Sequence, residues 1–194
     1  MFLMPDAKLS HRFPIGEEAV LEELKQKDFR RFYSKWYSPK RMVLVVVGDV
    51  GPLEVEKQVE EYFSTFKNRR ESPEPDWGQV TEFGRREKFI SEPEAPAVTV
   101  SIQTLRPFAF QPDSSNRRRE ELLRQMSMNI LERRFEILAK TKDAAFSQGS
   151  SYAYTWLDFV EVTGVELTTK EKDWRRAFQT AEQESRRALM YGFT

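Results

Sequence analysis

The side chains that could carry out chemistry are few in this 194-residue sequence, which has no cysteine and one histidine, His11. Thiolate nucleophiles, disulfides and cysteine-bound metals are therefore excluded. A zinc enzyme of the usual kind needs two or three histidines, so a zinc site is not expected either. A Ser-His-Asp triad would have to use His11, which stands beside Arg12 and close to Pro14. We interpret His11 as a surface or loop histidine.

Carboxylates are plentiful, but their spacing does not predict an acid/base pair. The adjacent glutamates at 17–18, 22–23 and 60–61 fall in expected helices, where neighbouring residues point to different sides. Glu161 and Glu166 are expected to face each other across a possible hairpin, with no further reactive group around them. The sequence therefore predicts no catalytic, cofactor-binding or metal-binding residue in this chain.

The charge balance bears on the class of partner. Lysine and arginine number 31, aspartate and glutamate also 31, and the formal net charge is +0. Arginine clusters at 69–70, 85–86 and 117–119 have glutamates beside them, which favours an ion-paired, solvated surface over a nucleic-acid interface. A nucleic-acid-binding module is kept as the less favoured alternative. No apolar run approaches the roughly 20 residues of a membrane span, so we expect no nucleic acid and no membrane as partners.

The first third of the chain has the clearest patterns. Apolar spacing predicts helices over 17–26, 28–37 and 52–66, and the run MVLVVV at 42–47 predicts a strand buried on both faces. The aromatic stripe on the second of these helices, with Phe29, Phe32 and Trp36, is expected to be core, as is the valine run.

The remainder predicts a two-layer α+β domain. Prolines and charges around 69–82 indicate a linker. Strands are expected at 88–90, 97–105, 146–156 and 159–169, with Leu157 and Asp158 at the bend and Tyr152, Tyr154 and Trp156 on one face. Helices are expected from Asp113 or Ser114 to about 140, and from about 171 to 192. This order predicts an antiparallel sheet with helices packed on one face.

Two stretches together resemble the insulinase/pitrilysin family of zinc metallopeptidases. RFPIG at 12–16, FRRFYSKWYSP at 29–39 and MVLVVVGDV at 42–50 are similar to the end of the family's first, zinc-carrying domain. NILERRFEIL at 129–138 and DAAF at 143–146 are similar, more weakly, to the opening of the second domain. The resemblance implies three parts: 1–68 as the end of the first domain, 69–82 as a linker, and 83–194 as the start of a second, non-catalytic domain.

The resemblance also implies what this chain lacks. The family's His-x-x-Glu-His motif supplies two zinc ligands and the glutamate that activates water, and it lies upstream of the RFPIG turn in other members. The chain is thus expected to be a fragment that begins after the zinc site, with phenylalanine at 146 where other members place a substrate-holding tyrosine in a late domain. No catalytic residue is transferred, zinc is expected in the parent protein only, and this chain is predicted to be inactive alone.

An exposed apolar strand would be an aggregation site, so the strand at 42–47 needs a partner. We hypothesise that this strand and the following helix complete the second part's sheet, giving a circularly permuted domain, since an extended linker of a dozen residues spans roughly 40 Å. The same completion between two chains would give a swapped homodimer.

The sequence therefore predicts a non-catalytic portion of a zinc metalloendopeptidase that forms part of the wall of the peptide-binding chamber. The expected partners are a peptide or protein substrate and the remaining domains of the parent, which the resemblance to long bacterial members places in the periplasm. A structural homologue with no peptidase activity is the alternative.

Overall fold

The computed structural model describes residues 3–12, 14–67, 73–81 and 84–193. The chain forms two compact units, which are described separately. Unit 1 combines Met1–Ser10 with Gly78–Thr194, and unit 2 comprises His11–Trp77.

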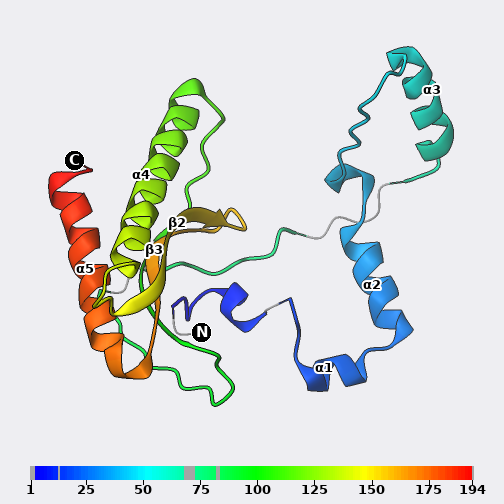
Figure 1. The fold of residues 1–194 in the computed structure, drawn as a ribbon. Coiled ribbons are helices and arrows are strands. Elements are labelled where there is room, and N and C mark those ends of the chain that lie inside the picture. Colours follow the sequence, from blue (N-terminus) through cyan, green and yellow to red (C-terminus); the bar gives the residue numbers. More distant parts are fainter. Residues whose placement is uncertain (1–2, 13, 68–72, 82–83, 194) are drawn as a thin grey trace. The chain divides into compact units, whose positions relative to one another are not determined.

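Unit 1 is built on an antiparallel sheet of three strands in the order β1-β3-β2. The strands are β1 (Val98–Pro107), β2 (Phe146–Trp156) and β3 (Val160–Thr169), with β3 in the centre (Figure 1). Leu157 and Asp158, both at positive φ, form the expected bend between β2 and β3. A bulge between Phe146 and Gln148 shifts the register at the far end of β2.

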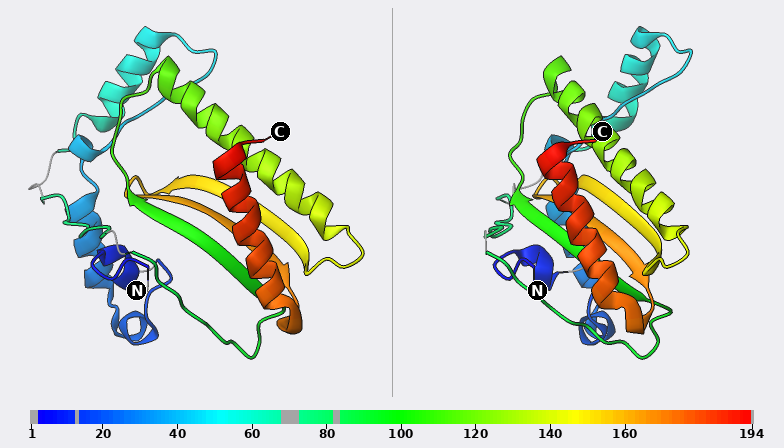
Figure 2. Two further views of the ribbon diagram at one scale, coloured as in Figure 1. Left: turned by 90° about the vertical axis from the view of Figure 1, so that its left-hand side faces the viewer. Right: turned by 60° about the vertical axis from the view of Figure 1, so that its left-hand side comes forward.

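Two long helices cover one face of this sheet (Figure 2): α4 (Ser115–Ala139) and α5 (Trp174–Tyr191), the latter entered through the 3-10 turn η3 (Glu171–Asp173). Ser114 caps α4, because its hydroxyl accepts a hydrogen bond from the Arg117 amide at 3.2 Å. The predicted α+β fold, an antiparallel sheet with helices on one face, is thereby confirmed.

The main core lies between the helices and the sheet. Phe135 of α4 and Leu167 of β3 are fully buried, and the Phe135 ring meets Phe146 edge-on with centroids 6.1 Å apart. Gly149 permits this approach, since a Cβ there would lie 2.6 Å from the Cβ of Phe135 and 2.5 Å from Leu167. Leu123 and Ile130 of α4 remain exposed outside this core.

A second, smaller core lies on the opposite face of the sheet, at the hairpin end. The N-terminal segment and the 3-10 turn η1 (Lys8–His11) place Met4, Ala7 and Leu9 against Val160 and Val162. An isolated bridge between Ala7 and Gly78, and a 2.8 Å hydrogen bond from the Thr81 hydroxyl to the Asp6 carboxylate, hold this segment in place. The sequence analysis did not predict this packing.

Unit 2 contains the short helices α1 (Glu18–Glu23), α2 (Gln26–Trp36) and α3 (Pro52–Phe63), with the 3-10 turn η2 (Pro39–Arg41). The α2 helix begins two residues before Asp28, the residue at which the sequence predicts it to begin. Asp28 instead accepts a 3.1 Å hydrogen bond from the Lys25 amide, three residues earlier, as in a capping box.

The strand expected at 42–47 does not form, and this corrects the completion hypothesis. The segment is irregular, with Val43 and Val47 about nine-tenths exposed, and the sheet contains only β1, β2 and β3 among the described residues. A strand needs a partner for its backbone groups, and the chain supplies none here. The intrachain, circularly permuted completion is therefore wrong, while the swapped dimer stays a prediction.

Two further expectations are wrong for a related reason. Phe29 and Phe32 of α2 were expected in the core but are about 60% exposed, because the short elements of unit 2 provide no second layer to cover them. The expected strand at 88–90 is also irregular, with Phe89 and Ile90 exposed.

Candidate functional site

Residues able to bind a metal do not come together in the part of the chain that the structure describes. No group of three histidine, aspartate or glutamate side chains there could hold an ion. His11 lies exposed at the end of η1. The described residues therefore do not offer a site for zinc, which the resemblance implies only for the parent protein.

Glu161 and Glu166 do not face each other, contrary to expectation. Both lie on β3, five residues apart, so their side chains point to opposite faces of the sheet. The bend at Leu157 and Asp158 places Thr155 opposite Glu161 and Ser150 opposite Glu166. An acid/base pair between the two glutamates is thereby excluded.

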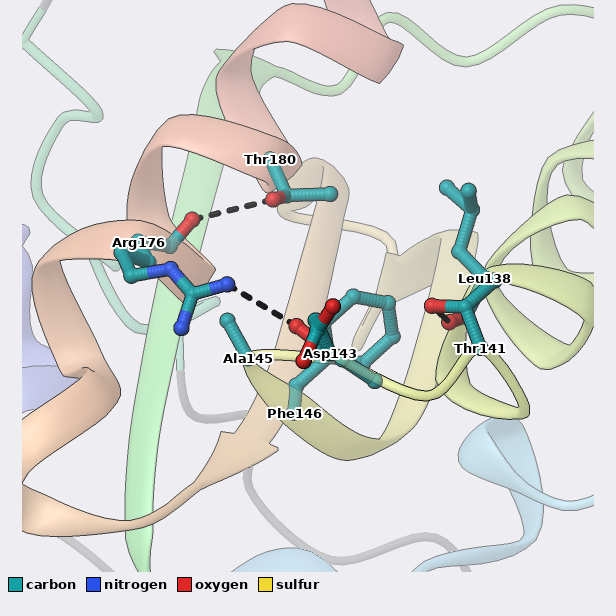
Figure 3. A pocket seen from close by; sticks show the side chains of 8 residues that line it. Leu138, Thr141, Asp143, Ala145, Phe146, Arg176 and Thr180 are labelled. Carbon is teal, nitrogen blue, oxygen red and sulfur yellow. Dashed lines mark hydrogen bonds between the residues drawn. The ribbon is translucent and has the colours of Figure 1, made fainter.

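A small pocket of about 130 Å³ lies where the loop after α4 meets α5 (Figure 3). Arg176 of α5 reaches toward this loop and donates a 2.9 Å hydrogen bond to the Asp143 carbonyl. Thr180 and Thr141 each donate to a carbonyl of their own helical turn. Arg176 thus joins the loop to α5, and the two threonine hydroxyls are engaged by nearby carbonyls, so we interpret the pocket as structural.

The sheet face that points away from the helices offers a different kind of site. We call it the open face, and it contains the side chains of cross-strand partners in successive rows. The rows nearest the hairpin bend are apolar, and the N-terminal segment packs there. The next two rows are polar and consist, from β1 through β3 to β2, of Gln103, Gly164 and Tyr152, and of Ser101, Glu166 and Ser150.

The ring of Tyr152 packs over Gly164 on the open face. A Cβ on Gly164 would lie 2.8 Å from the Tyr152 hydroxyl oxygen and 2.9 Å from a ring carbon, so the ring lies across the glycine. The ring of Tyr154 stands 5.9 Å away, centroid to centroid, tilted by 41°. Glycine is needed at 164 because any side chain would displace the aromatic ring.

The electrostatics of Tyr152 follow from this position. Burial raises the pKa of its hydroxyl above the usual value, and the charges of Glu166 and, to a lesser extent, Tyr154 raise it further. A side-chain hydrogen bond with Gln103 acts in the opposite direction. The Tyr152 hydroxyl is therefore a neutral hydrogen-bonding group at physiological pH, and the arrangement can bind a ligand but supplies no nucleophile.

Sequence reasoning placed Tyr152, Tyr154 and Trp156 on one face, and the strand register confirms this. It missed the neighbourhood of Glu166 and Tyr152. A usable signal was present, since a two-residue bend fixes the register of an antiparallel pair, and counting back from it aligns 152 with 164 and 150 with 166.

The fold defines an α+β domain with an antiparallel sheet and helices on one face, and comparison with known proteins identifies its class. The family model described as the Peptidase M16 inactive domain matches residues 23–193. The chain therefore belongs to the Peptidase M16 inactive domain family. The resemblance to insulinase-type zinc peptidases is thereby confirmed.

Similar sequences bear names of the same kind. The chain is 28% identical over 189 residues to the Zinc protease PQQL-like of Arabidopsis thaliana, an alignment that covers 94% of this chain and 19% of that protein. It is 41% identical over 58 residues to Protein YhjJ of Salmonella typhimurium strain LT2, covering 30% of this chain and 12% of that protein. This chain thus spans less than a fifth of the length of these relatives.

Solved structures of the same fold include the first half of the periplasmic protease PqqL from Escherichia coli, with a TM-score of 0.79 and 18% identity over 100% of this chain and 41% of that chain. The ferredoxin protease FusC, in complex with Arabidopsis ferredoxin, has a TM-score of 0.71 and 18% identity over 98% of this chain and 21% of that chain. Among the described residues of our chain, every helix is too short or too polar to cross a membrane.

Proposed function

We propose that this chain is a non-catalytic portion of a zinc metalloendopeptidase, and that its open face forms part of the wall of the chamber that holds the peptide. One observation carries the proposal. The open face offers hydroxyl, amide and carboxylate groups with two aromatic rings, as a polypeptide-binding surface requires, while the same face contains no nucleophile paired with a base.

The proposed organisation keeps 1–68 as the end of a first peptidase-like domain, 69–82 as a linker and 83–194 as the start of a second. Unit 2 supports the need for further domains, because Phe29, Phe32 and the valine run at 42–47 expose large apolar side chains to solvent. Such surface normally contacts another protein part. In this proposal the remaining domains of the parent cover it and supply the zinc site.

Three finer points belong to the same proposal. The parent binds zinc in a domain outside this chain, its substrate is a peptide or a protein, and it works in the periplasm. The periplasmic placement is supported by the fold shared with the periplasmic protease PqqL of Escherichia coli. The alternative is a scaffold homologue without peptidase activity.

The experiment combines binding and turnover on the purified 194-residue chain. A capped, uncharged nine-residue peptide is titrated into isotope-labelled protein, and peptide cleavage and zinc content are measured on the same sample. We expect shifts of amide signals in β1, β2 and β3, no cleavage, and no stoichiometric zinc. Shifts confined to other elements would overturn the chamber-wall role, and chelator-sensitive cleavage would overturn the non-catalytic assignment.

Assays of the full-length parent protein distinguish the two candidate functions, peptidase and scaffold. Chelator-sensitive cleavage of the same peptide by the parent supports the peptidase. A parent that binds the peptide without cleaving it supports the scaffold.

A further inference from the structure

Glu166 occupies an unusual electrostatic position. It is the one ionisable carboxylate in the rows of the open face formed by β1, β2 and β3, and its neighbours in the row are two serines. No cation of the described residues forms an ion pair with it. Several other glutamates of unit 1 do have such a partner, since Glu121, Glu182 and Glu184 are each paired with an arginine.

A tyrosine ring, that of Tyr152, lies in the row next to this carboxylate, and a second, that of Tyr154, lies one row farther on. The Tyr152 ring lies across Gly164, is partly buried and packs in part against the small core at the hairpin end. Tyr154 adds a second, half-exposed ring 5.9 Å away. A lysine or arginine above a tyrosine ring is attracted by the π-electrons, and a nearby carboxylate adds to that attraction.

We propose that Glu166, Tyr152 and Tyr154 form a site for a cationic side chain, lysine or arginine, of a polypeptide bound on the open face. This inference rests on the proposed function and specifies which polypeptides the chamber wall favours. A divalent metal is a poorer occupant, because a single carboxylate does not supply the several oxygen ligands that such ions need.

The surrounding row fits a peptide backbone. The hydroxyls of Ser101 and Ser150 lie on either side of Glu166, and the Gln103 amide lies beside Tyr152 in the next row. These groups can hydrogen-bond to the amides of an extended chain whose cationic side chain reaches Glu166. An acidic side chain placed there would meet the Glu166 carboxylate and be repelled.

The test uses three capped nine-residue peptides of glycine, serine, alanine and glutamine that differ only in a central arginine, glutamine or glutamate. Each is titrated into the 194-residue chain, and dissociation constants are obtained from NMR shifts. We expect the arginine peptide to bind roughly three- to tenfold more tightly than the glutamine peptide. The glutamate peptide should bind more weakly than either. Added salt should reduce the preference.

Three substitutions test which residues cause the preference for the arginine peptide over the glutamine peptide. Glu166→Gln should abolish most of the difference between arginine and glutamine peptides, and Tyr152→Leu should reduce it. Glu161→Gln, on the same strand but the opposite face, is the matched control and should leave the difference unchanged.

The results distinguish a failure of the cation site from a failure of the proposed function. If all three peptides bind the open face equally, or if Glu166→Gln keeps the full arginine preference, the cation site is wrong and the chamber wall stands. If none of the peptides binds at millimolar concentration, the proposed function fails and the cation site fails with it.

Discussion

The ring of Tyr152 lies over Gly164, its partner across the β2–β3 pair, with the hydroxyl oxygen 2.8 Å from where a Cβ would stand. Gly164→Ala should therefore displace the ring and lower the free energy of unfolding by about 1–3 kcal/mol. Urea unfolding followed by tyrosine and tryptophan fluorescence measures this.

Gly84→Ala is the matched control for this substitution. No atom lies within 4 Å of a Cβ added at Gly84, so its effect should stay within about 0.5 kcal/mol. Equal effects of the two substitutions would contradict the placement of the Tyr152 ring.

Alkaline pH should act on unit 1 through Tyr152. Because its pKa is raised in the folded state, unfolded protein releases the proton first, at about pH 10. The stability from this group is fully present below that pH and is lost as the pH rises through the raised pKa. Tyr152→Phe should flatten this part of the stability profile. A profile unchanged by the substitution would contradict the assignment.

Glu166→Gln should lower the pKa of Tyr152, since the glutamate charge contributes to raising it, while burial, the larger cause, keeps it above the usual value. NMR of ¹³C-labelled tyrosine across the alkaline range measures this. A Tyr152 pKa that does not move would show that the two groups lie farther apart than the structure has them.

Arg134 of α4 and Glu184 of α5 form an ion pair that joins the two helices, and the contacting atoms are buried. Glu184→Gln should lower the free energy of unfolding by about 1–3 kcal/mol, because the guanidinium loses its charged partner in a poorly hydrated place. Glu182→Gln removes an exposed ion pair with Arg186 on the same helix and should cost at most about 0.5 kcal/mol. Thermal unfolding distinguishes the two, and similar losses would contradict the interhelical role.

The valine run offers a test of the corrected topology. Val45 is 73% exposed and belongs to no strand, so Val45→Lys should leave the melting temperature of unit 1 unchanged within about 1 °C. Val165→Lys, in the core of unit 1, should unfold it. Marked destabilisation of unit 1 by Val45→Lys would restore the hypothesis that 42–47 completes its sheet.

Local patterns predicted unit 1 well. Alternating residues flanking Leu157 and Asp158 gave the β2–β3 hairpin, and the Ser114 cap preceded a long helical pattern in α4. The residue pattern of each of these elements is sufficient to predict it, and the elements that each one packs against lie within the same chain. The fold class followed from their order.

The features that local sequence patterns did not predict depend on contacts between residues far apart in the chain. The run 42–47 has strand propensity, but a strand also needs a hydrogen-bonding partner, and propensity does not reveal whether one exists. The packing of Met4, Ala7 and Leu9 on the sheet involves residues more than 150 positions away. The proximity of Glu166 to Tyr152 can be predicted only once the residues of β2 and β3 have been aligned from the bend that joins them.

The most direct test of the account is photo-crosslinking of an uncharged, benzophenone-bearing peptide to the 194-residue chain, with the attachment sites mapped by mass spectrometry. The account predicts crosslinks on the open face, around Ser101, Tyr152 and Tyr154, with the peptide recovered uncleaved. Crosslinks only on α4 and α5 or on unit 2, or a cleaved peptide, would contradict it.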